Sequence, residues 1–163
     1  METTFEKIPS FKIDHTKLLP GLYVSRIDKV GNEPVTTYDI RLVRPNKGQE
    51  FSTGAMHALE HLGAYYLRNQ PDVKEKILYF GPMGCRTGFY LIMVGFYEPK
   101  ALVPLLLATF NYIFQYAGGV PGATETECGN YRDMDLEKAK EYAKRYLEEF
   151  LLNPQNEQLE YPQ

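Results

Sequence analysis

The chain has 163 residues, of which 44% are hydrophobic and 24% charged, and these values are typical of a globular protein with one domain. A formal net charge of -3 without any Lys/Arg cluster argues against binding to nucleic acid or to an anionic membrane. No segment has the roughly 20 apolar residues that span a bilayer, and the polar N-terminus has no apolar secretory segment, so we expect a cytoplasmic protein. In a reducing compartment, the two cysteines are expected to act as ligands, catalysts or core residues rather than as a disulfide.

The first half of the chain predicts two hairpins with a helix between them. Residues 22–30 and 35–43 are rich in Val, Ile, Tyr and Thr and flank a turn signal, Gly31-Asn32-Glu33-Pro34, which together indicate a β-hairpin. A helix is expected over residues 54–69, capped by Ser52 or Thr53. Two more strands, 77–80 and 89–96, flank a loop with three glycines in the eight residues 81–88.

The second half predicts two helices and a long loop. A helix begins near Pro99 and ends before Gly118-Gly119, residues 120–132 form a loop, and a last helix covers about 135–152. We expect an α+β fold in which an antiparallel β-sheet packs against helices as an α/β sandwich. Residues 1–153 would form the single domain, and 154–163 a C-terminal tail that frays.

The run His57-Ala58-Leu59-Glu60-His61 is the strongest functional signal. Two histidines four residues apart on a helix lie on one face, one turn apart, so both imidazoles can bind one metal ion. Glu60 then lies beside the metal as a candidate base. The order H-x-x-E-H is the inverted form of the H-E-x-x-H zinc signature and predicts a catalytic metal site.

A catalytic site of this kind needs a third protein ligand and an open position for substrate. Cys85, Cys128 and His15 are the candidates, and their spacing does not choose among them. Cys85, in the Gly-rich loop, could equally be a small apolar residue in a tight turn, and Cys128 could be a surface thiol.

Five segments together resemble the S-ribosylhomocysteine lyase (LuxS) family. They occur in the family's order, span nearly the whole chain, and show no departure at a position the family uses for metal binding or acid/base chemistry. The segments are Ser10-Phe11 with Asp14-His15, Asp39-Ile40-Arg41, the helix segment 57–61, the loop segment 81–90, and Cys128-Gly129-Asn130-Tyr131-Arg132.

The resemblance implies a role for each matching residue. His57, His61 and Cys128 would bind the metal, one ion per chain, which in the family is Fe²⁺ with Zn²⁺ or Co²⁺ as substitutes. Glu60 and Cys85 would be the catalytic acid/base pair. Three further residues would line the substrate site: Ser10, His15 and Arg41. The family enzymes are homodimers with both sites at the interface, so Ser10 and His15 would reach the metal site of the neighbouring subunit.

The implied reaction converts S-ribosylhomocysteine into homocysteine and 4,5-dihydroxy-2,3-pentanedione, the precursor of the quorum-sensing signal autoinducer-2. A thioether leaves readily only when a carbonyl lies β to the C–S bond, so the carbonyl must first migrate along the sugar. A Lewis-acidic metal and two acid/base groups suit that chemistry. Arg41 is a candidate for binding the substrate or for placing positive charge beside Cys85.

Two other functions share parts of this pattern. An inverted-motif zinc metallopeptidase would use the same helix with Glu60 as base toward water, but such proteases are longer and take a distal glutamate as third ligand. A metal-stabilised binding protein would need a closed site with four ligands, such as both histidines of the motif with Cys85 and Cys128.

Overall fold

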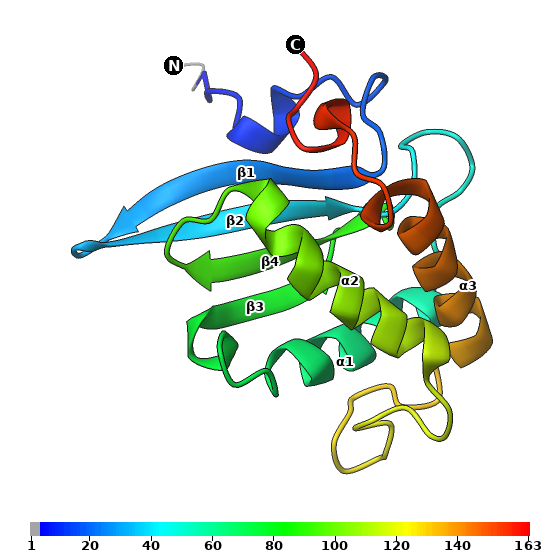
Figure 1. Ribbon diagram of the computed structural model, residues 1–163. Helices are drawn as coiled ribbons and strands as arrows, with labels where there is room; N and C mark the ends of the chain where they lie inside the picture. Colours follow the sequence, from blue (N-terminus) through cyan, green and yellow to red (C-terminus); the bar gives the residue numbers. More distant parts are fainter. Residues whose placement is uncertain (1–3) are drawn as a thin grey trace.

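The computed structural model describes residues 4–163 and contains one four-stranded antiparallel sheet with three helices on one of its faces (Figure 1). The strand order is β1-β2-β4-β3. The strands are β1 (Gly21–Val30), β2 (Glu33–Arg41), β3 (Ile77–Pro82) and β4 (Gly88–Val94), and the helices are α1 (Thr53–Leu67), α2 (Pro99–Gln115) and α3 (Leu136–Tyr146). The predicted α+β fold is confirmed.

The hairpin of β1 and β2 closes in a tighter turn than predicted. Val30 pairs with Glu33, which leaves only Gly31 and Asn32 between the strands. Gly31 has a φ of 63°, a left-handed conformation that glycine adopts without steric cost. The second strand therefore begins at Glu33, two residues earlier than the start at residue 35 that the turn signal predicted.

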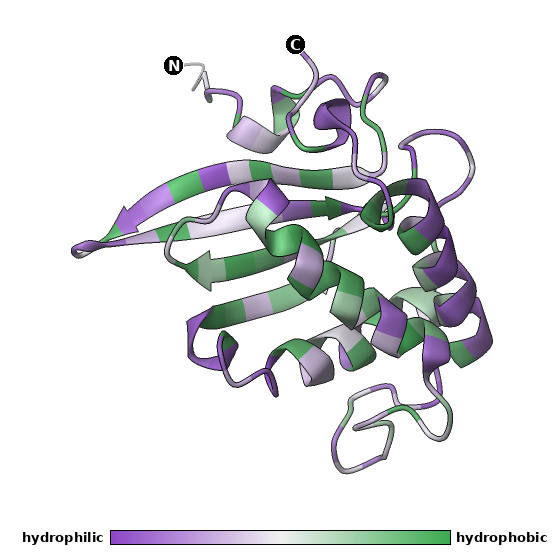
Figure 2. Cartoon of the chain, in the orientation of Figure 1, coloured by the Kyte–Doolittle hydropathy of each residue, from purple (hydrophilic) through white to green (hydrophobic). Residues whose placement is uncertain are grey.

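One face of the sheet forms the core with the helices. Side chains alternate along a strand, so Tyr38 and Ile40 of β2 point toward the helices while Asp39 and Arg41 point to the opposite face. Figure 2 shows the polar residues of α3 along its outer side. The helices supply the other half of the core, including Leu59, Leu62, Leu106, Phe110, Ala143 and Tyr146.

The predicted last helix changes its winding near its end. α3 ends at Tyr146, and residues Leu147–Leu151 continue as a π-helical turn. The amide of Leu152 donates to the carbonyl of Leu147, five residues back, at 3.0 Å. This turn keeps Leu147, Phe150 and Leu151 buried. Within residues 4–163, no helix is both long and apolar enough to cross a membrane.

The expectation that the C-terminal tail frays is wrong. After a short 3-10 helix (Asn156–Gln158), the tail lies beside the N-terminal segment above β1 (Figure 1). Gln158 Nε2 donates to the carbonyls of Pro20 and Glu149, each at 2.9 Å. These hydrogen bonds and the ring of Tyr161, which stacks on Tyr23, hold the tail on the domain.

Candidate metal centre and active site

Helix α1 positions the two histidines of the motif. Ser52 caps its N-terminus by accepting a hydrogen bond from the Ala55 amide, as one of the two predicted caps. The apolar side of the helix is buried in the core, which leaves His57 and His61 half-buried on the side that faces the loop after α2. Their rings are 4.7 Å apart between centroids.

Backbone carbonyls orient both imidazole rings. Nδ1 of His57 donates to the carbonyl of Asp133 at 3.0 Å, and Nδ1 of His61 donates to that of Pro121 at 2.8 Å. These bonds put the proton of a neutral ring on Nδ1 and leave Nε2 free as a ligand, which is the usual outer arrangement of a metal-binding histidine. The two carbonyls also fix the loop on either side of Cys128.

Cys128 completes a group of three ligand atoms. One atom each from His57, His61 and Cys128 lie within 4.8 Å of one another. The Cys128 sulfur is 3.4 Å from Nε2 of His57. Ligands about 2.0–2.3 Å from a tetrahedral ion are roughly 3.5 Å apart, so this separation fits a shared ion. Two imidazoles and one thiolate suit iron, cobalt or zinc and leave a fourth position open.

Glu60 lies beside this group at the edge of a groove. The groove has a volume of about 530 Å³ and is lined by α1 and by the loop that carries Pro121 and Gly122. Glu60 and His61 both line it, and Glu60 is half-buried. A carboxylate at a solvent-connected groove next to a metal site can exchange protons with a bound molecule.

A second polar cluster forms around Arg41 on the face of the sheet away from the helices. Its guanidinium binds the Asp39 carboxylate in a two-pronged pair, with Nη2 2.6 Å from Oδ2 and Nε 3.1 Å from Oδ1. The third nitrogen, Nη1, donates to Thr87 Oγ1 at 2.8 Å and lies 3.8 Å from the Cys85 sulfur. The structure therefore brings Arg41 and Cys85 together.

The charge of Arg41 is retained although the residue is buried. Burial opposes the charged form, but the Asp39 carboxylate outweighs that cost, so the pKa of Arg41 is raised above its usual value. Cys85 itself is exposed and lies outside the group of potential metal ligands. Its sulfur lies 3.8 Å from the buried guanidinium of Arg41.

Ser10 and His15 lie in the N-terminal segment that precedes β1. Ser10 is in a short 3-10 helix and lines a groove of about 750 Å³ that also contains Thr37 and Tyr90 of the outer sheet face. Nδ1 of His15 donates to the carbonyl of Ile13 at 2.9 Å. Neither residue belongs to the metal-ligand group of residues 4–163, so His15 is not the third ligand within the chain.

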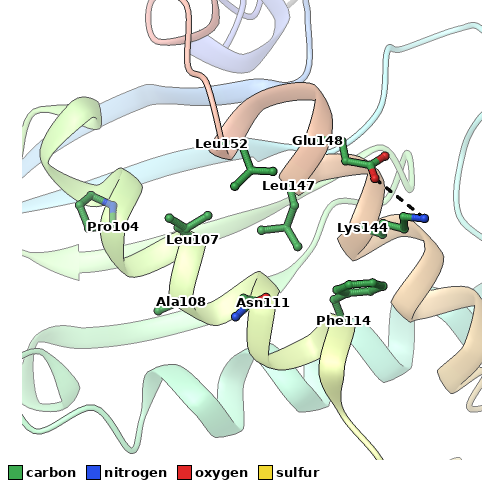
Figure 3. A pocket seen from close by; sticks show the side chains of 9 residues that line it. All are labelled: Pro104, Leu107, Ala108, Asn111, Phe114, Lys144, Leu147, Glu148 and Leu152. Carbon is green, nitrogen blue, oxygen red and sulfur yellow. Dashed lines mark ion pairs between the residues drawn. The ribbon is translucent and has the colours of Figure 1, made fainter.

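A further cavity of about 540 Å³ lies between α2 and the end of α3 (Figure 3). Its polar lining consists of Asn111 and the ion pair Lys144–Glu148, in which Nζ and Oε1 are 3.9 Å apart. None of the predicted site residues lines this cavity, so we do not assign it to the active site.

Sequence reasoning missed several groups that support the site. Asp39 was part of a matching segment but had no role, and Thr87 and Tyr161 were not singled out. Two opposite charges at alternate positions of an apolar strand, Asp39 and Arg41, could have indicated a buried pair on one face. The carbonyls of Pro121 and Asp133 have no signal in the sequence.

Comparison with known proteins identifies the family of the chain. The family model for S-ribosylhomocysteinase (LuxS) matches residues 8–157. A Clostridium beijerinckii protein named S-ribosylhomocysteine lyase is 52% identical over 157 residues, which cover 96% of this chain and 99% of the relative. Relatives of the same name from Desulfotalea psychrophila and Phocaeicola vulgatus are 50% and 49% identical, over 96% and 95% of this chain and 99% and 96% of their own lengths. Because the family model and these relatives each cover almost the whole chain, the chain belongs to the S-ribosylhomocysteinase (LuxS) family.

Proposed function

We propose that this protein is a metal-dependent S-ribosylhomocysteine lyase, which releases homocysteine and 4,5-dihydroxy-2,3-pentanedione from S-ribosylhomocysteine. Family membership supports the substrate, and the grouping of His57, His61 and Cys128 beside Glu60 is the observation that supports the metal dependence. A thiolate among the ligands also favours the lyase over an inverted-motif peptidase, which would take a carboxylate there.

The metal in this proposal is Fe²⁺, with Zn²⁺ or Co²⁺ as substitutes and one ion per chain. The site fits each of these ions, because imidazole and thiolate bind all three. Backbone carbonyls hold Nδ1 of each histidine, so Nε2 of each ring is available to the ion. A bound divalent ion would supply Lewis acidity toward the oxygens of the sugar.

The protein's own groups would carry the protons. The carbonyl of the open-chain sugar migrates by two proton transfers between neighbouring carbons, and a third proton abstraction then expels the homocysteine thiolate. Glu60 and Cys85 are the acid/base groups in this scheme. Arg41, fixed by Asp39, keeps positive charge beside the Cys85 sulfur and is also available to a hydroxyl of the substrate.

The assembly in this proposal is a cytoplasmic homodimer with two shared sites. The outer face of the sheet supports it, because none of the three α-helices covers this face and Val30 of β1 is 63% exposed there. Ser10 lines a groove on the same face, so a second subunit packed here would meet the N-terminal segment. Ser10 and His15 would then complete the partner's substrate site.

Complementation between two inactive variants tests the shared sites. A His15→Ala chain mixed with a Glu60→Ala chain should regain activity, because each mixed dimer holds one site with both residues intact. If subunit exchange is verified by mass spectrometry and no activity returns, the site lies within one chain.

Titration of released thiol tests the function itself. The metal-loaded protein should release one thiol for each molecule of S-ribosylhomocysteine consumed, and protein freed of metal by a chelator should not. Absence of thiol release by the loaded protein refutes the lyase. Hydrolysis of unstructured peptides by the same sample would instead indicate the peptidase.

A further inference from the structure

The C-terminal tail reaches the same face of the sheet as the Arg41 cluster. Tyr23 of β1 pairs with Asp39 of β2, so their side chains share this face. The ring of Tyr161 stacks on Tyr23 with centroids 4.9 Å apart and planes inclined by 13°. The stack fixes where the Tyr161 hydroxyl lies, directly above the Asp39 carboxylate.

A continuous chain of polar contacts runs from this hydroxyl to the Cys85 sulfur. The Tyr161 hydroxyl donates to Asp39 Oδ2 at 2.8 Å, and the same oxygen accepts from Arg41 Nη2 at 2.6 Å. With two of its nitrogens held by Asp39, the Arg41 fork directs Nη1 toward Thr87 and the Cys85 sulfur. The orientation of the Asp39 carboxylate therefore sets the orientation of the Arg41 guanidinium. The Tyr161 hydroxyl helps to fix that carboxylate.

The hydroxyl is suited to act as a permanent donor. Burial, and then the neighbouring Asp39 carboxylate, raise the pKa of Tyr161 far above its ordinary value, so the phenol keeps its proton at any physiological pH. Asp39 and Arg41 are only 1% and 2% exposed, which means that water cannot readily replace a lost donor. A hydrogen bond to a charged, buried acceptor is among the stronger kinds.

We propose that Tyr161 is a positioning residue of the active site, which orients the Asp39–Arg41 pair and through it sets the environment of the Cys85 thiol. This inference rests on the proposed function for the role of Cys85, but the contacts themselves do not depend on it. The tail would thus contribute to catalysis without touching the substrate.

The variant Tyr161→Phe tests this role, because it keeps the ring on Tyr23 and removes only the hydroxyl. Two quantities are measured in the metal-loaded full-length protein: the rate at which iodoacetamide alkylates Cys85 at pH 7, resolved from Cys128 by peptide mass spectrometry, and kcat and KM for thiol release. We expect kcat to fall about 10-fold, the usual loss when a residue that orients a functional group is removed. The alkylation rate of Cys85 should fall about 3-fold or more, since a displaced cation stabilises the reactive thiolate less.

Tyr23→Phe is the matched control. It removes a hydroxyl from the other ring of the same stack, but that hydroxyl donates to the carbonyl of Leu19 and not to Asp39. Tyr23→Phe should unfold close to the wild-type temperature, and Tyr161→Phe several degrees below it, because it loses a hydrogen bond to a charged, buried acceptor. Only Tyr161→Phe should change the alkylation of Cys85.

Either of two results overturns the proposal: wild-type alkylation and kcat in Tyr161→Phe, or equal losses in both variants, which would mean that the stack acts only on stability. Alkylation of Cys85 requires no turnover. A wild-type protein without lyase activity would therefore refute the proposed function while the effect on Cys85 could still be measured.

Discussion

Removal of one charge from the buried Asp39–Arg41 pair should destabilise the protein far more than removal of a charge from an exposed pair. In Asp39→Asn the side chain keeps its size, but Arg41, 2% exposed, is left with an uncompensated charge. Loss of one partner of a buried pair costs about 3–5 kcal/mol. In a chain of this length each kcal/mol lowers Tm by roughly 2–4 °C, so Tm should fall by about 6–20 °C.

The exposed pair Arg145–Glu149 on α3 provides the control. Its N–O distance is 3.2 Å and its side chains are 38% and 41% exposed, so Glu149→Gln removes a similar carboxylate from a similar Arg partner in water. Pairs of this kind contribute about 0–1 kcal/mol. Thermal and urea unfolding of both variants, at equal protein and metal concentrations, should therefore differ by several kcal/mol. If Asp39→Asn costs no more than Glu149→Gln, the buried pair is not structural and the reasoning about Arg41 fails.

Three other changes address the metal centre and its helix. Cys128→Ala should lose most bound metal by elemental analysis, whereas Cys85→Ala should keep its metal and lose about 10²–10⁴-fold in kcat; the opposite pattern would exchange the roles of the two cysteines. Gly122 has a φ of 72°, and a β-carbon there would lie 3.3 Å from Nδ1 of His61. Gly122→Ala should therefore weaken metal binding, measured in competition with a chelator. Unchanged affinity would show that the loop adapts. Ser52→Ala removes the cap of α1 and should cost about 1 kcal/mol in urea unfolding, and a neutral result would mean that another group satisfies the Ala55 amide.

The parts of the site that a single helix controls could be predicted from the sequence. The spacing of His57 and His61 places them on one face of any α-helix, because the helical repeat alone fixes that geometry. Cys128, the third member of the group that could hold a metal, is 71 residues away from His57, on a loop without regular structure. No local rule links residues so far apart, so the sequence left three candidates open, and only the family resemblance favoured Cys128.

The same limit applies to the Arg41 cluster. Alternation along a strand predicts that Asp39 and Arg41 share a face, but it does not predict that this face is covered. In the structure Tyr23, Thr87 and the tail exclude water from the pair, and these groups come from three separate parts of the chain. Burial turns an ordinary surface pair into a fixed, charged support for Cys85, and burial is a property of the tertiary fold.

The tail shows why position in the sequence is a weak guide to order. Chain ends fray when nothing binds them, and the last ten residues carry no long apolar run that would have predicted packing. They are held by polar contacts instead, through the Gln158 amide at two carbonyls and the Tyr161 hydroxyl at a buried carboxylate. Such contacts need an acceptor that is already fixed and protected from water, which the domain provides at Pro20 and Asp39. The end of the chain thus binds the same buried Asp39–Arg41 pair that contacts Cys85, so we expect the stability of the tail and the geometry at Cys85 to depend on one another.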